Sequence, residues 1–121
     1  MSWWVWLGVA VLGGVGACGR FLLDSVIAAR AGGDFPVGTL TVNASGALLL
    51  GLLTGLAVHG NLLVLAGTAT LGSYTTFSTW MLETHRLAED GEGLSAIANI
   101  LLSLAVGIGA AALGKVIGAQ L

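Results

Sequence analysis

The chain of 121 residues is 56% hydrophobic and 8% charged, with a formal net charge of −2 at pH 7. Soluble domains carry roughly 25% charged residues, so this composition excludes a water-soluble domain and indicates a membrane protein. Four basic residues are too few for a nucleic-acid interface. A lone cysteine, Cys18, excludes an intrachain disulfide and a cysteine-ligated metal site within one chain.

Long apolar segments predict an all-α membrane protein that forms a single domain, residues 1–121. Each segment is close to the ~20 residues that a helix needs to cross the hydrocarbon core of a bilayer. The four expected transmembrane helices cover approximately residues 3–19, 36–58, 61–83 and 94–117. The expected connections are charged loops at 20–34 and 83–92 and a tight turn near His59. Four crossings would place both termini on one side of the membrane.

Basic residues give little indication of orientation. Arg20, Arg30 and Arg86 are expected on one side and Lys115 on the other, and the positive-inside rule is weak with so few charges. Charge alone leaves open a single orientation, with the first and third loops in the cytoplasm, and a dual topology with antiparallel pairing. Arg20, after the first span, is either a helix-end anchor or a group that attracts anions to a vestibule.

The second span contains Asn43, whose amide offers two donors and an acceptor. Left unpaired in hydrocarbon, such a group costs on the order of several kcal/mol. We therefore expect either a hydrogen bond to a neighbouring helix or a donor to a passing anion. The same span carries Gly51 and Gly55, a spacing that lets helix backbones approach closely.

The third span is rich in hydroxyls around Gly72, including Ser78 and Thr79. This pattern fits either a helix that packs on its neighbours or a broken helix that binds an ion, because polar groups at membrane depth face protein or a watery cavity. Phe77 and Trp80 are three residues apart and share a helix face. Their ring edges are positively polarised and could contact an anion; ordinary apolar packing is the alternative.

In the fourth span, Asn99 and Ser103 are four residues apart and share a face. With Asn43 and the hydroxyls of the third span they could form a polar stripe without fixed charge. Such a stripe suits a small anion that must bind and leave quickly, because conduction requires favourable but not deep binding. For Ser103 alone, a bond back to a main-chain carbonyl is the alternative.

At these residues the chain resembles the Fluc (CrcB) family of small fluoride channels, in order and over nearly its whole length. The matching motifs are Gly13-Gly14-x-Gly16-Ala17-x-x-Arg20, Gly38-Thr39-Leu40-x-Val42-Asn43-x-x-Gly46, Gly72-x-x-Thr75-Thr76-Phe77-Ser78-Thr79 and Asn99-x-x-x-Ser103-x-x-x-Gly107.

The resemblance implies passive, selective export of fluoride through two pores at the interface of an antiparallel, dual-topology homodimer. It implies a multi-pass protein of the cell membrane, the inner membrane in a bacterium, surrounded by lipid. It also implies a sodium ion at the dimer centre, held by the carbonyls of Gly72 and Thr75 of both copies. The implied pore residues are Asn43, Phe77, Ser78, Thr79, Trp80, Asn99 and Ser103.

This sequence departs from the family pattern at two places in the third span. Trp80 stands where a second phenylalanine is usual, and Ser73-Tyr74 stand where a second glycine and a small or apolar residue are common. We therefore expect the break in the third helix to depend on Gly72 alone.

Titratable side chains are missing from the expected membrane centre, which argues against a coupled transporter. A proton-coupled small multidrug-type transporter, the main alternative, would require a carboxylate in the first span, and none occurs between Met1 and Gly19. Glu83 lies at the end of the third span, not at its centre. No arrangement typical of an enzyme is present. A non-transporting assembly subunit would explain the glycines but not the aligned amides and hydroxyls.

Overall fold

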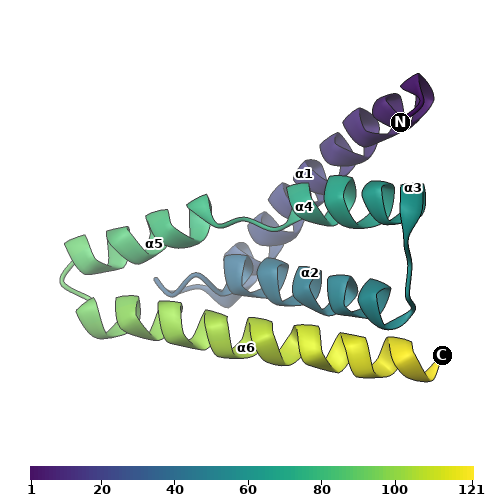
Figure 1. The fold of residues 1–121 in the computed structure, drawn as a ribbon. Coiled ribbons are helices and arrows are strands. Elements are labelled where there is room, and N and C mark those ends of the chain that lie inside the picture. The colour runs from purple at the N-terminus through teal and green to yellow at the C-terminus, as the bar shows by residue number, and fades with distance from the viewer.

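The computed structural model describes all 121 residues and contains helices but no strands (Figure 1). The elements are α1 (Trp3–Ala31), α2 (Val37–Gly55), α3 (Gly60–Leu62), the π-helix η1 (Leu63–Leu71), α4 (Gly72–Tyr74), α5 (Ser78–Glu89) and α6 (Gly93–Gln120). Three of them, α1, α2 and α6, are long and apolar enough to cross a membrane. The predicted helical class is confirmed.

Helix α1 is longer than the sequence suggested. Residues 20–31 continue the helix, so the prediction of a loop from Arg20 is wrong. Neither glycine nor proline occurs between Arg20 and Ala31, and the helix ends only at Gly32 and Gly33, which adopt φ of 64° and 72°. At 1.5 Å per residue the 29 residues of α1 extend about 43 Å, more than the ~30 Å of a hydrocarbon core. Helix α5 likewise runs through the predicted loop as far as Glu89.

Helices α2 and α6 lie side by side and run in the same direction (Figure 1). Their contact is made by glycines. A Cβ added at Gly51 or Gly55 would overlap the carbonyl oxygen of Ala111 or Lys115, and one added at Gly114 would overlap that of Leu48. The Gly51–Gly55 pair therefore serves backbone contact within the chain, as small residues do between membrane helices.

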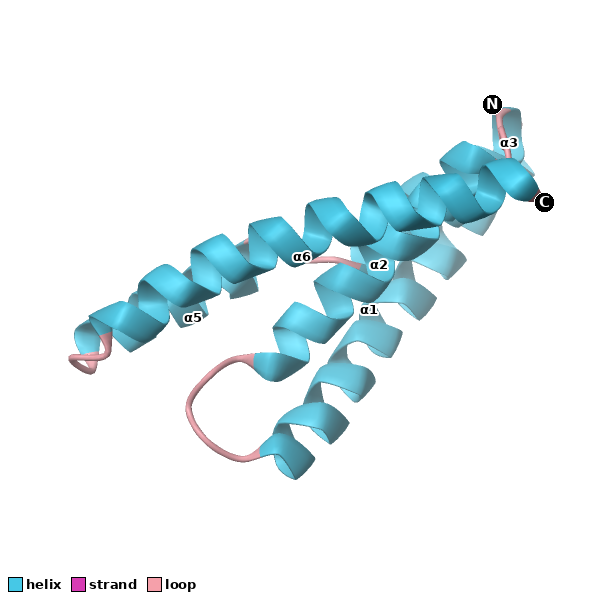
Figure 2. Cartoon of the chain, turned by 90° about the horizontal axis from the view of Figure 1, so that it is seen from below, coloured by secondary structure: helices cyan, strands magenta, loops and turns pink.

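The chain folds back so that both termini lie at the same end as α3, while the α1–α2 and α5–α6 connections lie at the other end (Figure 2). Helix α1 crosses η1 and α4 obliquely and touches them at Gly16, where a Cβ would overlap the Thr70 carbonyl. Only 17 of the 121 residues are buried. Many large apolar side chains are exposed on the outer surface, as expected for contact with lipid or with another chain.

The helical stretch from Gly60 ends at Tyr74, and α5 begins at Ser78. Gly72 itself is helical, with φ −62° and ψ −37°. The chain leaves the helix at Thr75, whose φ of −81° and ψ of 160° are extended. The expected break at Gly72 is thus wrong in position. Two consecutive threonines, whose branched side chains favour extended backbone, occupy the place where the helix ends.

Candidate functional site

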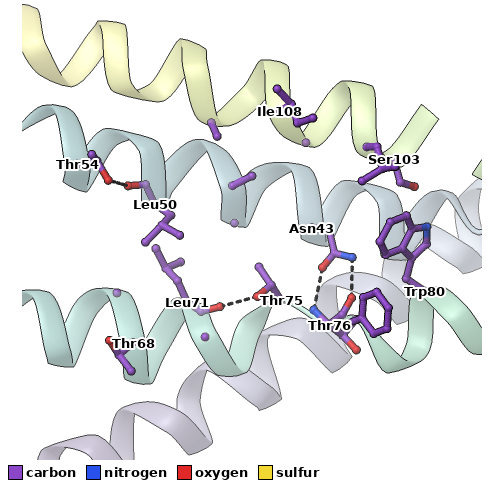
Figure 3. A pocket seen from close by; sticks show the side chains of 18 of the residues that line it. Asn43, Leu50, Thr54, Thr68, Leu71, Thr75, Thr76, Trp80, Ser103 and Ile108 are labelled. Atoms are coloured by element: carbon purple, nitrogen blue, oxygen red, sulfur yellow. Dashed lines mark hydrogen bonds between the residues drawn. The ribbon is translucent and has the colours of Figure 1, made fainter. Parts of the chain in front are cut away.

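A cavity of about 900 Å³ opens beside Thr75–Phe77, the interruption between α4 and α5. Its walls come from α2, η1, α4 and α6, and Trp80 lies at one end (Figure 3). Phe77 also lines it. No charged residue lines it. Its polar lining consists of Asn43, Thr54, Thr68, Thr75, Thr76 and Ser103.

Asn43 joins α2 to the interruption through two hydrogen bonds (Figure 3). Its Nδ2 donates to the Thr76 carbonyl at 2.8 Å, and its Oδ1 accepts from the Thr76 N–H, also at 2.8 Å. The hydrogen bond to a neighbouring segment that the sequence allowed is therefore present. One N–H of the Asn43 amide stays unbonded, and Asn43 lines the cavity.

At the interruption, main-chain N–H groups donate to side-chain oxygens, whereas in an α-helix they would donate to main-chain carbonyls. In an α-helix, the N–H groups of Thr76 and Thr79 would bond to the carbonyls of Gly72 and Thr75. Here the Thr76 N–H bonds to Asn43, and the Thr79 N–H bonds to Thr76 Oγ1 at 3.2 Å. As a result, the carbonyls of Gly72 and Thr75 accept no hydrogen bond within the chain.

Phe77 and Trp80 meet edge to face, with ring centroids 5.7 Å apart and planes at 87°. Phe77 is 69% exposed in the single chain. The Trp80 indole Nε1 donates to the Asn99 carbonyl of α6 at 3.1 Å, which points this donor away from the cavity. Trp80 therefore offers the cavity an aromatic ring, as a phenylalanine would.

Asn99 lies behind the wall of the cavity and is 1% exposed. Its Nδ2 donates to Thr84 Oγ1 at 2.8 Å, which ties α6 to α5. Ser103, one turn further along α6, lines the cavity and makes only a long contact of 3.4 Å to Asn99 Oδ1. Of the two polar residues expected on one face of α6, only Ser103 lines the cavity.

A second, smaller cavity of about 180 Å³ lies on the other side of the interruption. It is lined by Arg20, Phe21, Asp24, Thr39, Val42, Thr76 and Thr79. The Nε of Arg20 is buried there without a hydrogen-bond partner. Arg20 lies within α1 and not at its end. Thr76 is the only residue that lines both cavities.

A family model described as "CrcB-like protein, Camphor Resistance (CrcB)" matches residues 7–115, nearly the whole chain. The chain belongs to the CrcB-like family. It is 54% identical over 111 residues to a protein of Mycobacterium tuberculosis named fluoride-specific ion channel FluC 2, covering 92% of this chain and 88% of that protein. A Symbiobacterium thermophilum protein named fluoride-specific ion channel FluC 1 is 46% identical over 121 residues, covering 95% of this chain and 96% of that protein.

Family membership and three membrane-length helices make this CrcB-like chain a multi-pass membrane protein. The structure brings together Asn43, Phe77, Trp80 and Ser103 on the large cavity, together with Gly72 and Thr75. Thr79 lies on the small cavity. Ser78 begins α5, with its hydroxyl 3.5 Å from that of Thr76.

Two links between α2 and the third segment were not predicted from the sequence. The Tyr74 hydroxyl lies 2.8 Å from Ser45 Oγ, and the Thr39 hydroxyl donates to a Glu83 carboxylate oxygen at 2.5 Å. The signal for the first was the unusual Tyr74 itself, a phenol within an apolar segment that must find a partner when buried. The second had no local signal, since the two residues are 44 positions apart.

Proposed function

We propose that this protein is a fluoride channel that lets fluoride leave the cell passively and so lowers its toxicity. Similarity to proteins named fluoride-specific ion channels, over 92% of the chain, carries the proposal. The uncharged polar lining of the large cavity supports it. A lysine or arginine at membrane depth would hold an anion deeply, whereas amide and hydroxyl donors allow it to bind and leave.

Three groups on the large cavity are suited to replace water around fluoride. Asn43 has one unbonded N–H, and the hydroxyl of Thr68 makes no hydrogen bond within the chain. Ser103 has only its long contact to Asn99 and can turn its hydroxyl toward an ion. Arg20, with its unpartnered Nε, would attract the anion to the small cavity on the other side of Thr76.

No energy coupling is required for export. Hydrogen fluoride crosses membranes unaided and ionises in a neutral cytoplasm, which traps fluoride inside. A membrane potential that is negative inside favours exit of an anion by about 2.3 kcal/mol per 100 mV. A passive path is therefore sufficient.

The working unit in this proposal is an antiparallel dimer of two copies with dual topology and two pores. In each copy, α3, η1, α4 and α5 together make one more membrane crossing beside α1, α2 and α6. It is the third crossing in chain order and is interrupted at Thr75–Phe77. The large cavity is bounded by one chain on its α2, η1 and α6 sides, and a second copy would complete its wall. Exposed apolar residues of α6, Leu104 and Ile108, border it and could pack against that copy.

A sodium ion at the dimer centre fits the residues of this chain. Gly72 and Thr75 line the large cavity, and their carbonyls accept no hydrogen bond. Unbonded main-chain carbonyls are the ligands that channels use for monovalent cations. When bound, the ion would supply a fixed positive charge between the two copies.

Fluoride efflux from liposomes tests the function directly. We expect the purified protein to release fluoride down its gradient without a proton gradient and to release chloride, the control ion, far more slowly. Uptake of an organic cation driven by a pH difference, with no fluoride efflux, would reject the channel in favour of the proton-coupled alternative.

A further inference from the structure

The carbonyls of Gly72 and Thr75 are unbonded for a specific reason. Each is the α-helical acceptor for an N–H group four residues later, at Thr76 and Thr79. Both of these N–H groups are taken by side-chain oxygens instead, Asn43 Oδ1 at 2.8 Å and Thr76 Oγ1 at 3.2 Å. The two carbonyls in question are the pair that the proposed function assigns to a cation.

Side chains of α2 also hold the interruption in its non-helical conformation. Tyr74, just before Thr75, is linked to Ser45 at 2.8 Å, and Thr76, just after it, is held by both polar atoms of the Asn43 amide. These two links favour the extended conformation of Thr75, which keeps the chain out of the helical path at this point.

We propose that Asn43 and Thr76 are positioning residues that create the cation site by diverting these two N–H groups from the Gly72 and Thr75 carbonyls. The proposal rests on the cation site included in the proposed function. It assigns a separate task to each side chain: Asn43 frees the carbonyl of Gly72, and the Thr76 hydroxyl frees that of Thr75. Asn43 thereby contributes to two sites at once, through its bonded Oδ1 and its unbonded N–H.

Thr76→Val tests the hydroxyl, because valine keeps the shape of threonine and removes Oγ1. The Thr79 N–H is then free to bond to the Thr75 carbonyl. The measurement is the thermal unfolding temperature of purified protein against sodium concentration, with sodium replaced by N-methylglucamine at constant ionic strength. A ligand that binds only the folded state raises this temperature as its concentration passes its dissociation constant. We expect the half-maximal sodium concentration to rise at least about tenfold in Thr76→Val.

Thr76→Ser restores the Oγ acceptor and should return the sodium midpoint to that of wild type, which a general packing defect would not do. Asn43→Ala, which frees the Thr76 N–H for the Gly72 carbonyl, should raise the midpoint independently of Thr76→Val. Thr41→Val is the matched control, since Thr41 Oγ1 bonds to the Val37 carbonyl on α2 at 2.8 Å, away from the interruption.

An unchanged sodium midpoint in Thr76→Val and Asn43→Ala would overturn the proposal, and so would a wild-type protein without a sodium response. Fluoride efflux of the wild type is measured on the same preparations. A sodium response that depends on Thr76 in a protein that releases no fluoride would support the cation site and reject the fluoride channel.

Discussion

Helix α2 makes two contacts of opposite character. Against α6 it presents Gly51 and Gly55, and the two backbones touch with nothing between them. Against the interruption at Thr75–Phe77 it presents Asn43 and Ser45, whose polar groups bond to the other segment. At the first contact both α2 and α6 are intact helices, so their main-chain N–H and C=O groups bond within each helix. At the second, side chains must replace the hydrogen bonds that the broken helix lacks.

The two contacts should therefore be sensitive to different kinds of substitution. The glycine contact depends on side-chain size, because there is no space between the helices for a single added methyl group. The polar contact depends on chemical identity, because an isosteric residue without the right atom leaves main-chain groups unpaired. Substitutions that change only size or only polarity can separate them.

The largest effect on stability is expected at the glycine contact. In Gly114→Ala the new Cβ would overlap the Leu48 carbonyl oxygen, which belongs to the backbone and cannot move aside without separating the helices. We expect a loss of about 3 kcal/mol, at the upper end of the usual range for overpacking, and a lower yield of monodisperse protein. Thermal unfolding in detergent measures it. Gly109→Ala is the matched control, since nothing lies within 4 Å of its Cβ; equal stability of the two variants would contradict the packing.

Asn43→Asp changes the polar contact with little change in size. The negative charge of a carboxylate facing the cavity repels an anion, so we expect fluoride efflux to fall at least about a hundredfold. The aspartate keeps an oxygen acceptor for the Thr76 N–H but has no donor for the Thr76 carbonyl, so fluoride efflux is the measurement that tests the ion path. Undiminished efflux would remove Asn43 from the ion path.

Trp80→Phe is expected to have the smallest effect. Phenylalanine keeps an aromatic ring against Phe77 but loses the 3.1 Å hydrogen bond to the Asn99 carbonyl, which should lower stability by about 1 kcal/mol. Trp4→Phe serves as control, because Trp4 is exposed and its indole makes no hydrogen bond. If the unfolding temperatures of both variants matched that of the wild type, the hydrogen bond from Trp80 on α5 to Asn99 on α6 would make no contribution to stability.

Periodicity and motif spacing predicted what depends on local sequence. The apolar segments, the Gly51–Gly55 contact, the Phe77–Trp80 contact and the role of Asn43 as a link between helices were all accessible from the sequence. Each follows either from residue type or from a spacing of three or four along the chain.

Features that depend on distant residues were not accessible. The interruption lies at Thr75 and not at Gly72, because Asn43 on another helix captures the Thr76 main chain. The burial of Asn99 depends on Thr84, whose hydroxyl accepts a hydrogen bond from the Asn99 amide. Thr84 was not expected in a helix, because the charges around it suggested a loop. The continuation of α1 beyond Arg20 is different, because it has a local signal: no residue there stops a helix, and the charges were wrongly interpreted as a loop.

The length of α1 bears on how the chain inserts. Arg20 precedes Arg30 by ten residues, about 15 Å along the axis, and Arg20 lines the small cavity. An arginine that lines a cavity of the fold is a poorer signal for the insertion machinery, which responds to basic residues flanking the bilayer. Arg30 and Arg86 at one end are then opposed by Lys115 near the other, a margin of one charge. Adding or removing one lysine could bias newly made copies toward a single orientation.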